Sequence, residues 1–151
     1  MDIFLEKYDL IFKEFAKGKP MVLSSAENNK VTSRMMSIVV VDRAFYFQTD
    51  KTFKKYQQLI NNPQVALCSG NISIEGICEE IGHPLDHVSF CEIYKECFCS
   101  SFNKYSSLKN ERLFVVKPMY VKRWVYIEGA PFMEVLDIKN RRYHLTKYEG
   151  V

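Results

Sequence analysis

Two β-rich segments separated by only two residues constrain the fold of this chain more than any other feature. Residues 31–41 (VTSRMMSIVVV) are rich in β-branched and other apolar side chains, and residues 44–49 (AFYFQT) continue the pattern after Asp42 and Arg43. Two such strands joined through a two-residue loop are typical of a β-hairpin. We therefore predict a hairpin over residues 31–49.

The whole chain of 151 residues has the length of one ordinary domain, which we expect to span residues 1–151. Residue periodicity predicts further strands at residues 21–25, 64–69, 72–81, 113–127 and 132–138. It predicts helices at residues 2–17, 52–61 and 86–102, and the polar tail 139–151 is expected to pack loosely. Long, nearly sequential strands favour a mainly β (α+β) fold, an antiparallel barrel of about six strands with flanking helices. A two-layer α+β sandwich is the alternative.

Composition and charge exclude several classes of protein. Apolar residues make up 47% and charged residues 26% of the chain, which is typical of a globular protein. The formal net charge of +3 is spread along the sequence and gives no reason to expect nucleic-acid or membrane partners. No apolar run approaches the roughly 20 residues that a transmembrane helix needs. The five cysteines, without an export signal, predict reduced thiols in a cytoplasmic protein.

Arg34 is the first residue whose chemistry needs an explanation. In the alternating strand it shares a face with Thr32, Met36, Ile38 and Val40. An arginine among apolar residues needs a carboxylate or a phosphate as its partner, because an unpaired buried charge is costly. A structural ion pair and an anion-binding site therefore both remain open for Arg34.

Lysines gather at the start of the helix predicted at residues 52–61. Asp50 or Thr52 can cap this helix, yet Lys51, Lys54 and Lys55 lie at the end where the helix dipole is already positive. A phosphate held by free backbone N–H groups and lysines would resolve that conflict. The alternative is a basic turn exposed to solvent.

An ordered set of short segments links these two features to the rest of the chain. It comprises residues 33–36 (SRMM), 45–49 (FYFQT), the pair Lys54 and Lys55, residues 62–67 (NPQVAL) and residues 74–76 (IEG). In this order, over residues 15–82, they resemble the pyridoxamine 5′-phosphate oxidase-like family of FMN-binding split β-barrels. The resemblance implies a six-stranded split barrel and a two-fold homodimer with FMN at the subunit interface.

The resemblance also implies roles for individual residues. Arg34, Lys54 and Lys55 match the residues that hold the FMN phosphate. The backbone from Met35 through Met36 and Ser37 to Val39 would run beneath the isoalloxazine ring, and Gln48 and Thr49 match a pair that contacts the flavin. Asn71 falls where the family often has a glutamine contributed across the dimer interface.

The chain also departs from the family. Pyridoxal-forming oxidases end in a segment with a tryptophan and an arginine-rich motif that hold the substrate phosphate. This chain has Trp124, but nothing after it matches that motif, so oxidation of pyridoxamine 5′-phosphate itself is not expected. No residue stands out as an acid or base, and catalytic residues stay unassigned. His83, His87, Cys97 and Cys99 lack metal-ligand spacing, so no metal site is predicted.

The leading functional hypothesis is an FMN-dependent oxidoreductase. An electron pair would pass between the flavin and a reduced nicotinamide or a small organic substrate. The main alternative is a non-enzymatic flavin or haem carrier or redox sensor on the same fold, because fold alone does not fix function. A deazaflavin-dependent reductase and a barrel without any cofactor are less favoured.

Overall fold

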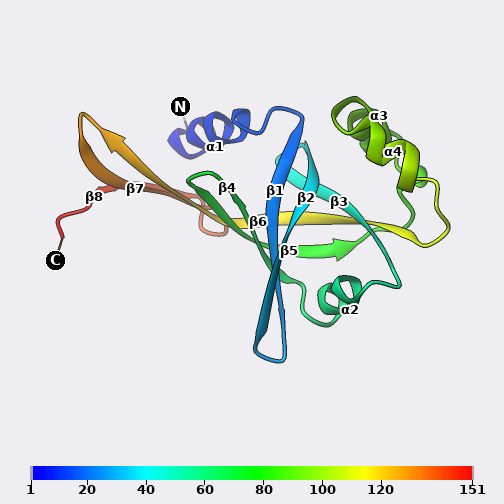
Figure 1. The fold of residues 1–151 in the computed structure, drawn as a ribbon. Helices are drawn as coiled ribbons and strands as arrows, with labels where there is room; N and C mark the ends of the chain where they lie inside the picture. The colour runs from blue at the N-terminus through cyan, green and yellow to red at the C-terminus, as the bar shows by residue number, and fades with distance from the viewer. Residues whose placement is uncertain (1, 151) are drawn as a thin grey trace.

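A single antiparallel sheet, closed on itself for most of its width, forms the frame of the protein (Figure 1). The structure is a computed structural model that describes residues 2–150. Its strands are β1 (Gly18–Glu27), β2 (Lys30–Val41), β3 (Ala44–Asp50), β4 (Gln64–Ser69), β5 (Ile72–Glu80), β6 (Glu111–Ile127), β7 (Ala130–Asp137) and β8 (Arg142–Lys147). They follow the order β3-β2-β1-β4-β5-β6-β7-β8, and β3 also pairs with β6. That pairing closes β1 to β6 into the predicted six-stranded barrel and excludes the sandwich.

The predicted hairpin is confirmed at its turn. Val41 pairs with Ala44, and the two residues between them, Asp42 and Arg43, have φ angles of 48° and 64°. Positive φ at both central residues is typical of the type I′ turn, whose twist matches that of two antiparallel strands.

Two expectations about element boundaries are wrong. The first strand begins at Gly18, earlier than the predicted residue 21, because residues 18–20 pair with β2. The helix predicted at 86–102 is divided at Phe98, whose ψ of 56° is not helical. It consists of a 3₁₀ turn, η1 (Pro84–Asp86), and the helices α3 (Val88–Cys97) and α4 (Cys99–Tyr105).

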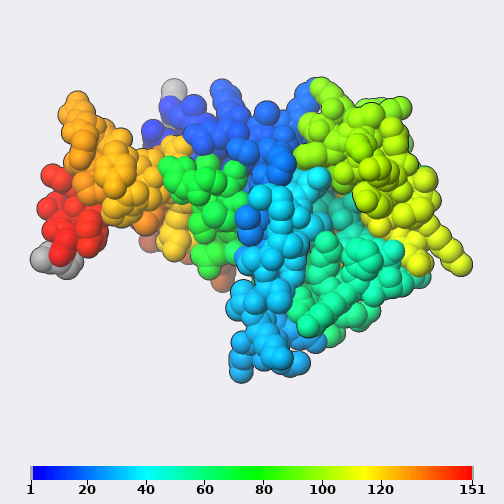
Figure 2. All heavy atoms as spheres, viewed as in Figure 1, coloured from blue at the N-terminus to red at the C-terminus, as the bar shows by residue number. Residues whose placement is uncertain are grey.

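The tail is also more ordered than expected. Residues 142–147 form β8, which pairs with β7 along its whole length, from Asp137↔Arg142 to Phe132↔Lys147. Most side chains of β8 are exposed, so it lacks the apolar alternation that marks a half-buried strand. The end of β6 with β7 and β8 projects from the barrel as an arm (Figures 1 and 2).

The core fills the barrel, and α1 (Ile3–Lys13) covers it. This helix buries Phe4, Tyr8, Ile11 and Phe12, as its spacing of three and four predicts. The ring of Phe12 lies 5.1 Å from that of Phe45 on β3. None of the helices within residues 2–150 is long and apolar enough to cross a membrane.

Replacing Phe45 with alanine tests this core. Phe45 is fully buried and also stacks edge-on against Phe15, with ring centroids 5.4 Å apart. We expect Phe45→Ala to lower the free energy of unfolding by about 3–5 kcal/mol, because it removes a ring and leaves a cavity. Leu145→Ala on exposed β8 is the control and should lower it by less than about 1 kcal/mol in urea denaturation. Equal losses in the two variants would contradict this placement of the core.

Candidate functional site

The barrel opens where the pairing between β2 and β3 ends. The two strands pair only from Val39↔Tyr46 to Val41↔Ala44 within the described residues. On its other edge β3 pairs with β6, from Phe45↔Val116 to Asp50↔Glu111, and on its other edge β2 pairs with β1. The stretch of β2 from Met35 to Ile38 therefore has a strand partner on one side only. Backbone N–H and C=O groups on its other edge are free to bond a ligand.

A pocket of about 380 Å³ lies at this opening. It is lined by six residues that the sequence singled out, namely Met35, Met36, Ser37, Gln48, Thr49 and Lys55. The prediction that these residues lie together is consistent with the geometry, although their role toward a cofactor stays a prediction.

Arg34 lies next to this pocket with no acidic partner. Its guanidinium donates to Ser25 Oγ at 2.9 Å, to Leu23 O at 3.4 Å and to Gln58 Oε1 at 3.4 Å, and it also contacts Thr32 Oγ1. All of these acceptors are neutral, so they orient the guanidinium without compensating its charge. The ion pair considered for Arg34 is thus not formed within residues 2–150, and partial burial lowers the pKa of Arg34.

Lys55 is the second cation of the site. Its Nζ lies 3.4 Å from Met36 Sδ, a weak acceptor. Burial and then the charge of Arg34 lower the pKa of Lys55, while Glu111 raises it. Two half-buried cations that repel one another form an electrostatic environment that favours an anion.

The start of α2 (Lys54–Asn61) adds to this environment. Phe53 is its N-cap residue, and no side chain caps the backbone N–H groups of the first turn. The expected caps are wrong, because the helix begins two residues later than predicted. The Asp50 carboxylate instead accepts from the backbone N–H and the hydroxyl of Thr52, at 2.8 and 2.7 Å, before the helix begins. Free N–H groups at a helix N-terminus favour anions.

Three predicted residues do not line the pocket: Arg34, which lies beside it, Lys54 and Asn71. The side chain of Lys54 is exposed and does not line it. Asn71 lies in the turn between β4 and β5, where its amide donates to the backbone carbonyl of Trp124 at 2.8 Å. The expected role of Asn71 across a subunit interface stays a prediction.

The hydroxyl of Thr49 is buried in the pocket wall without a hydrogen-bond partner in the described residues. Its neighbour Gln48 is also buried, but Gln48 Oε1 accepts a hydrogen bond from Ser106 Oγ at 2.8 Å. A buried hydroxyl without a partner costs free energy, and such groups recur where a ligand completes the site.

The pocket has a roof that sequence reasoning missed. Tyr94 of α3 and Ser101 and Tyr105 of α4 line it, together with Glu111 at the start of β6. The aromatic spacing of residues 86–102 predicted a helix, and nothing local in the sequence indicates which part of the barrel this helix covers. Figure 1 shows α3 and α4 at one end of the barrel, beyond β2 and β3.

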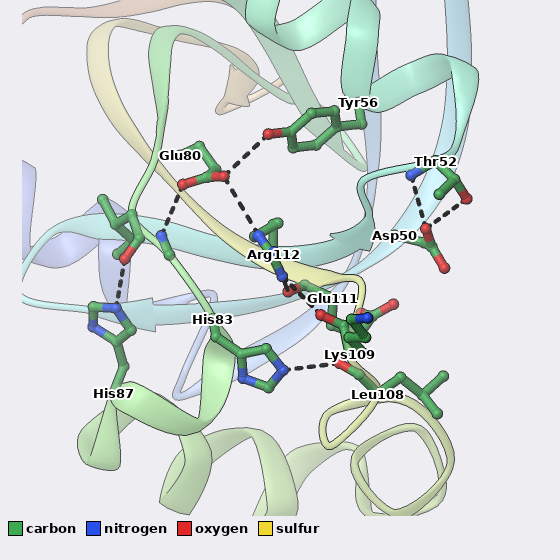
Figure 3. A network of polar contacts seen from close by, with 12 residues as sticks. Asp50, Thr52, Tyr56, Glu80, His83, His87, Leu108, Lys109, Glu111 and Arg112 are labelled. Carbon is green, nitrogen blue, oxygen red and sulfur yellow. Dashed lines mark hydrogen bonds and ion pairs between the residues drawn. The ribbon is translucent and has the colours of Figure 1, made fainter.

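Hydrogen bonds to backbone carbonyls hold both ends of this roof (Figure 3). His87 Nε2 donates to Ile81 O at 2.7 Å, and His83 Nε2 donates to Leu108 O at 2.8 Å. Glu80 accepts from Tyr56 Oη at 3.1 Å, which joins α2 to the end of β5. Within residues 2–150 no three metal-ligating side chains gather, and all five cysteines are free thiols.

Comparisons with known proteins bear on this architecture. No family model and no curated protein matches the sequence. Among solved structures, General Stress Protein 26 from Bacillus anthracis superposes with a TM-score of 0.62 and 21% identity, over 77% of this chain and 92% of that chain. A pyridoxamine 5′-phosphate oxidase-related, FMN binding protein from Nostoc punctiforme gives 0.62 and 11% identity, over 96% and 94%. The heme storage protein HutZ from Vibrio cholerae gives 0.59 and 15%, over 74% and 89%.

This chain has the fold of the pyridoxamine 5′-phosphate oxidase-like proteins. The likeness predicted from the order of sequence segments is thus confirmed for the split barrel. At these identities the likeness concerns the fold, and the chemistry of the pocket is argued from its own residues.

Thr49→Val tests the unpartnered hydroxyl. The substitution replaces the buried hydroxyl with a methyl group, so we expect the free energy of unfolding of the ligand-free protein to rise by about 1 kcal/mol. Thr32→Val is the matched control, because Thr32 Oγ1 donates to Gln58 Oε1 at 3.0 Å, and this variant should lose about 1–2 kcal/mol. Urea denaturation measures both, and a loss of stability in Thr49→Val would show that its hydroxyl is satisfied.

Proposed function

We propose that this protein binds FMN in the pocket between β2, β3 and α2 and uses it as a redox cofactor. The observation that carries the proposal is the pair Arg34 and Lys55, two half-buried cations beside the pocket without an ion-pair partner in the described residues. Leaving such charges uncompensated is costly, and a phosphate would compensate both.

The cationic corner suits a phosphate in geometry as well as in charge. The Arg34 guanidinium is held in place by neutral acceptors on β1 and α2, so it is oriented before any ligand arrives. The uncapped N-terminus of α2 supplies backbone N–H groups next to Lys55. A monoester phosphate carries up to two negative charges and accepts several hydrogen bonds. This corner offers two cations and backbone N–H donors to meet them.

The rest of the pocket suits a flat heteroaromatic ring. Met35, Met36, Phe53 and Tyr94 supply apolar surface, and the unpaired edge of β2 supplies backbone donors and acceptors. The buried hydroxyl of Thr49 offers one more polar group. Pockets that bind cofactors combine apolar walls with a few fixed polar groups in this way.

When bound, the flavin supplies the capacity to accept and donate an electron pair. The chain itself would hold the phosphate, orient the ring along β2 and restrict access of water through its α3–α4 roof. The electron donor would be a reduced nicotinamide or a small organic molecule. One structural neighbour is described as an FMN binding protein, which supports this proposal by analogy of fold.

A haem carrier is the alternative, since another neighbour is a heme storage protein. No histidine or cysteine lines the pocket within the described residues, because His83 and His87 bond backbone carbonyls elsewhere. Histidine and cysteine are common axial ligands of haem iron, so the lining favours a flavin.

FMN and riboflavin together test the phosphate site. Riboflavin has the same ring and ribityl chain but no phosphate, so we expect the protein to bind FMN more tightly. Arg34→Ala and Lys55→Ala should each weaken FMN binding by about 10- to 100-fold, the usual worth of a charge-assisted hydrogen bond. Their affinity for riboflavin should change little. Quenching of flavin fluorescence measures the affinities of the native protein and of both variants for the two ligands.

Arg43→Ala is the matched control for this experiment. Arg43 is a cation of the same barrel, but it pairs with Asp9 on the surface at 2.6 Å. Its removal should leave both affinities unchanged. If Arg43→Ala weakened FMN binding as much as Arg34→Ala, the effect would be one of net charge alone. Failure of the native protein to bind FMN would overturn the proposal. Haem absorption in place of flavin absorption in the purified protein would favour the carrier.

We further propose that two copies of the chain associate through the outer face of β2. Val31 and Met35 point from this face and are 71% and 64% exposed. Ile77 of β5, which is separated from β2 by β1 and β4 in the sheet, is 40% exposed. Val31 and Ile77 border an apolar depression of about 340 Å³, and Met35 borders the cofactor pocket. A second copy on this face would bury these side chains and close the pocket from outside.

Sedimentation equilibrium tests this association. The native protein should have twice the chain mass of 17.7 kDa. Val31→Glu should lower the observed mass toward that of a single chain, because the new carboxylate would be buried without a partner in the dimer. Leu10→Glu, on an apolar residue of α1 that is 48% exposed, is the control and should leave the dimer intact. A native monomer, or dissociation by Leu10→Glu alone, would contradict this interface.

A further inference from the structure

Glu111 is a buried acidic side chain in the wall of a pocket whose other features favour an anion. It is the first residue of β6, is 5% exposed, and lines the same pocket as Lys55 and Thr49. A carboxylate at this place opposes the phosphate that Arg34 and Lys55 favour. The conflict needs a physical resolution.

The side chain of Glu111 has no partner among residues 2–150. Its backbone N–H donates to Leu108 O, and its backbone carbonyl accepts from Arg112 at 2.6 Å, so the main chain is fixed. Its carboxyl group, in contrast, accepts no hydrogen bond there and has no cation within 4.0 Å. Burial without a partner favours the neutral form of a carboxyl group.

The neighbouring charges act in both directions. Asp50 lies directly opposite Glu111 on β3, so the two carboxyl groups share one face of the sheet at close range. Lys55 from α2 and His83 from the segment before η1 favour the ionised form, and Tyr94 of α3 faces the same pocket. Burial and Asp50 outweigh the cations and raise the pKa of Glu111 to about 7.

We propose that Glu111 is the proton-accepting residue of this pocket, becoming protonated when a phosphate-bearing ligand binds beside Lys55. The proposal rests on the proposed binding of FMN. An arriving phosphate adds negative charge next to a carboxyl group that already lacks a partner, so its protonated form is favoured further. Glu111 thereby determines at which pH the pocket retains an anionic ligand.

The direction of the pH dependence follows from linkage. The protonated carboxyl accommodates the phosphate better than the ionised one, so the affinity is highest below the pKa of the free site and falls as pH rises through neutrality. The fall should approach tenfold per pH unit until the pKa of the bound state is passed. Riboflavin has no phosphate, so its affinity should be far less dependent on pH.

Calorimetric titration of FMN into the 151-residue protein tests this proposal. At about pH 8, measurements in two buffers of different ionisation enthalpy give the number of protons taken up per FMN, which should approach about one. Titration of riboflavin should give about zero. Raising the pH from about 6.5 to about 8.5 should weaken FMN binding by at least about tenfold.

Glu111→Gln keeps the size of the side chain and removes its titration. This variant should show no proton uptake, and its FMN affinity at about pH 8.5 should match that at about pH 6.5. Glu79→Gln, on an exposed carboxylate of neighbouring β5, is the matched control and should behave as the native protein. A thermal unfolding curve establishes that each variant is folded.

The outcomes separate this proposal from the proposed function. FMN binding without proton uptake by the native protein overturns the role of Glu111 and leaves the cofactor assignment intact. Proton uptake that persists in Glu111→Gln but disappears in Asp50→Asn assigns the proton to Asp50 and likewise overturns the role of Glu111. No binding of FMN at any pH overturns both proposals.

Discussion

The divergence of β2 from β3 after Val39↔Tyr46 is the constraint on which the rest of the structure depends. A closed antiparallel barrel satisfies every backbone group through its neighbours and leaves no place for a ligand at the strand edges. Here β3 stays paired with β6 and β2 stays paired with β1, but β2 and β3 separate from each other, so the barrel has an unpaired edge from Met35 to Ile38. That edge defines where a ligand can bond the backbone, and the pocket lies against it.

Charge then distinguishes the two ends of the pocket. Arg34 and Lys55 lie on the side of β2 and α2 without acidic partners, whereas Asp50 and Glu111 lie on the paired ends of β3 and β6. Such a separation is unfavourable in the ligand-free protein, because each pair repels internally and burial weakens solvation. Functional sites often keep this kind of local instability, which a bound ligand relieves. The same arrangement makes ligand binding and proton binding interdependent.

The parts of this structure that could be predicted from sequence are those that local patterns determine. The hairpin turn at Asp42 and Arg43 follows from loop length, and the face of Arg34 follows from strand alternation. Glu111 and the roof residue Tyr94 could not be placed, because their burial depends on which distant strand or helix packs against them. The strand β8 escaped prediction for a related reason, since backbone pairing to β7 determines it and its exposed side chains carry no alternation.

The roof and the opening of the barrel are connected through one residue. Val39 is the residue of β2 at which its pairing with β3 stops, at the end away from the hairpin turn. It is fully buried in a small apolar cluster with Phe90 and Tyr94 of α3 and Leu113 of β6. The helix that covers the pocket is therefore packed on the point where the strands separate. A shift of the β2–β3 junction would move Tyr94 with it, because close-packed clusters transmit displacement and do not absorb it. The packing of Val39 against α3 thus sets both the geometry of the pocket and the position of its roof.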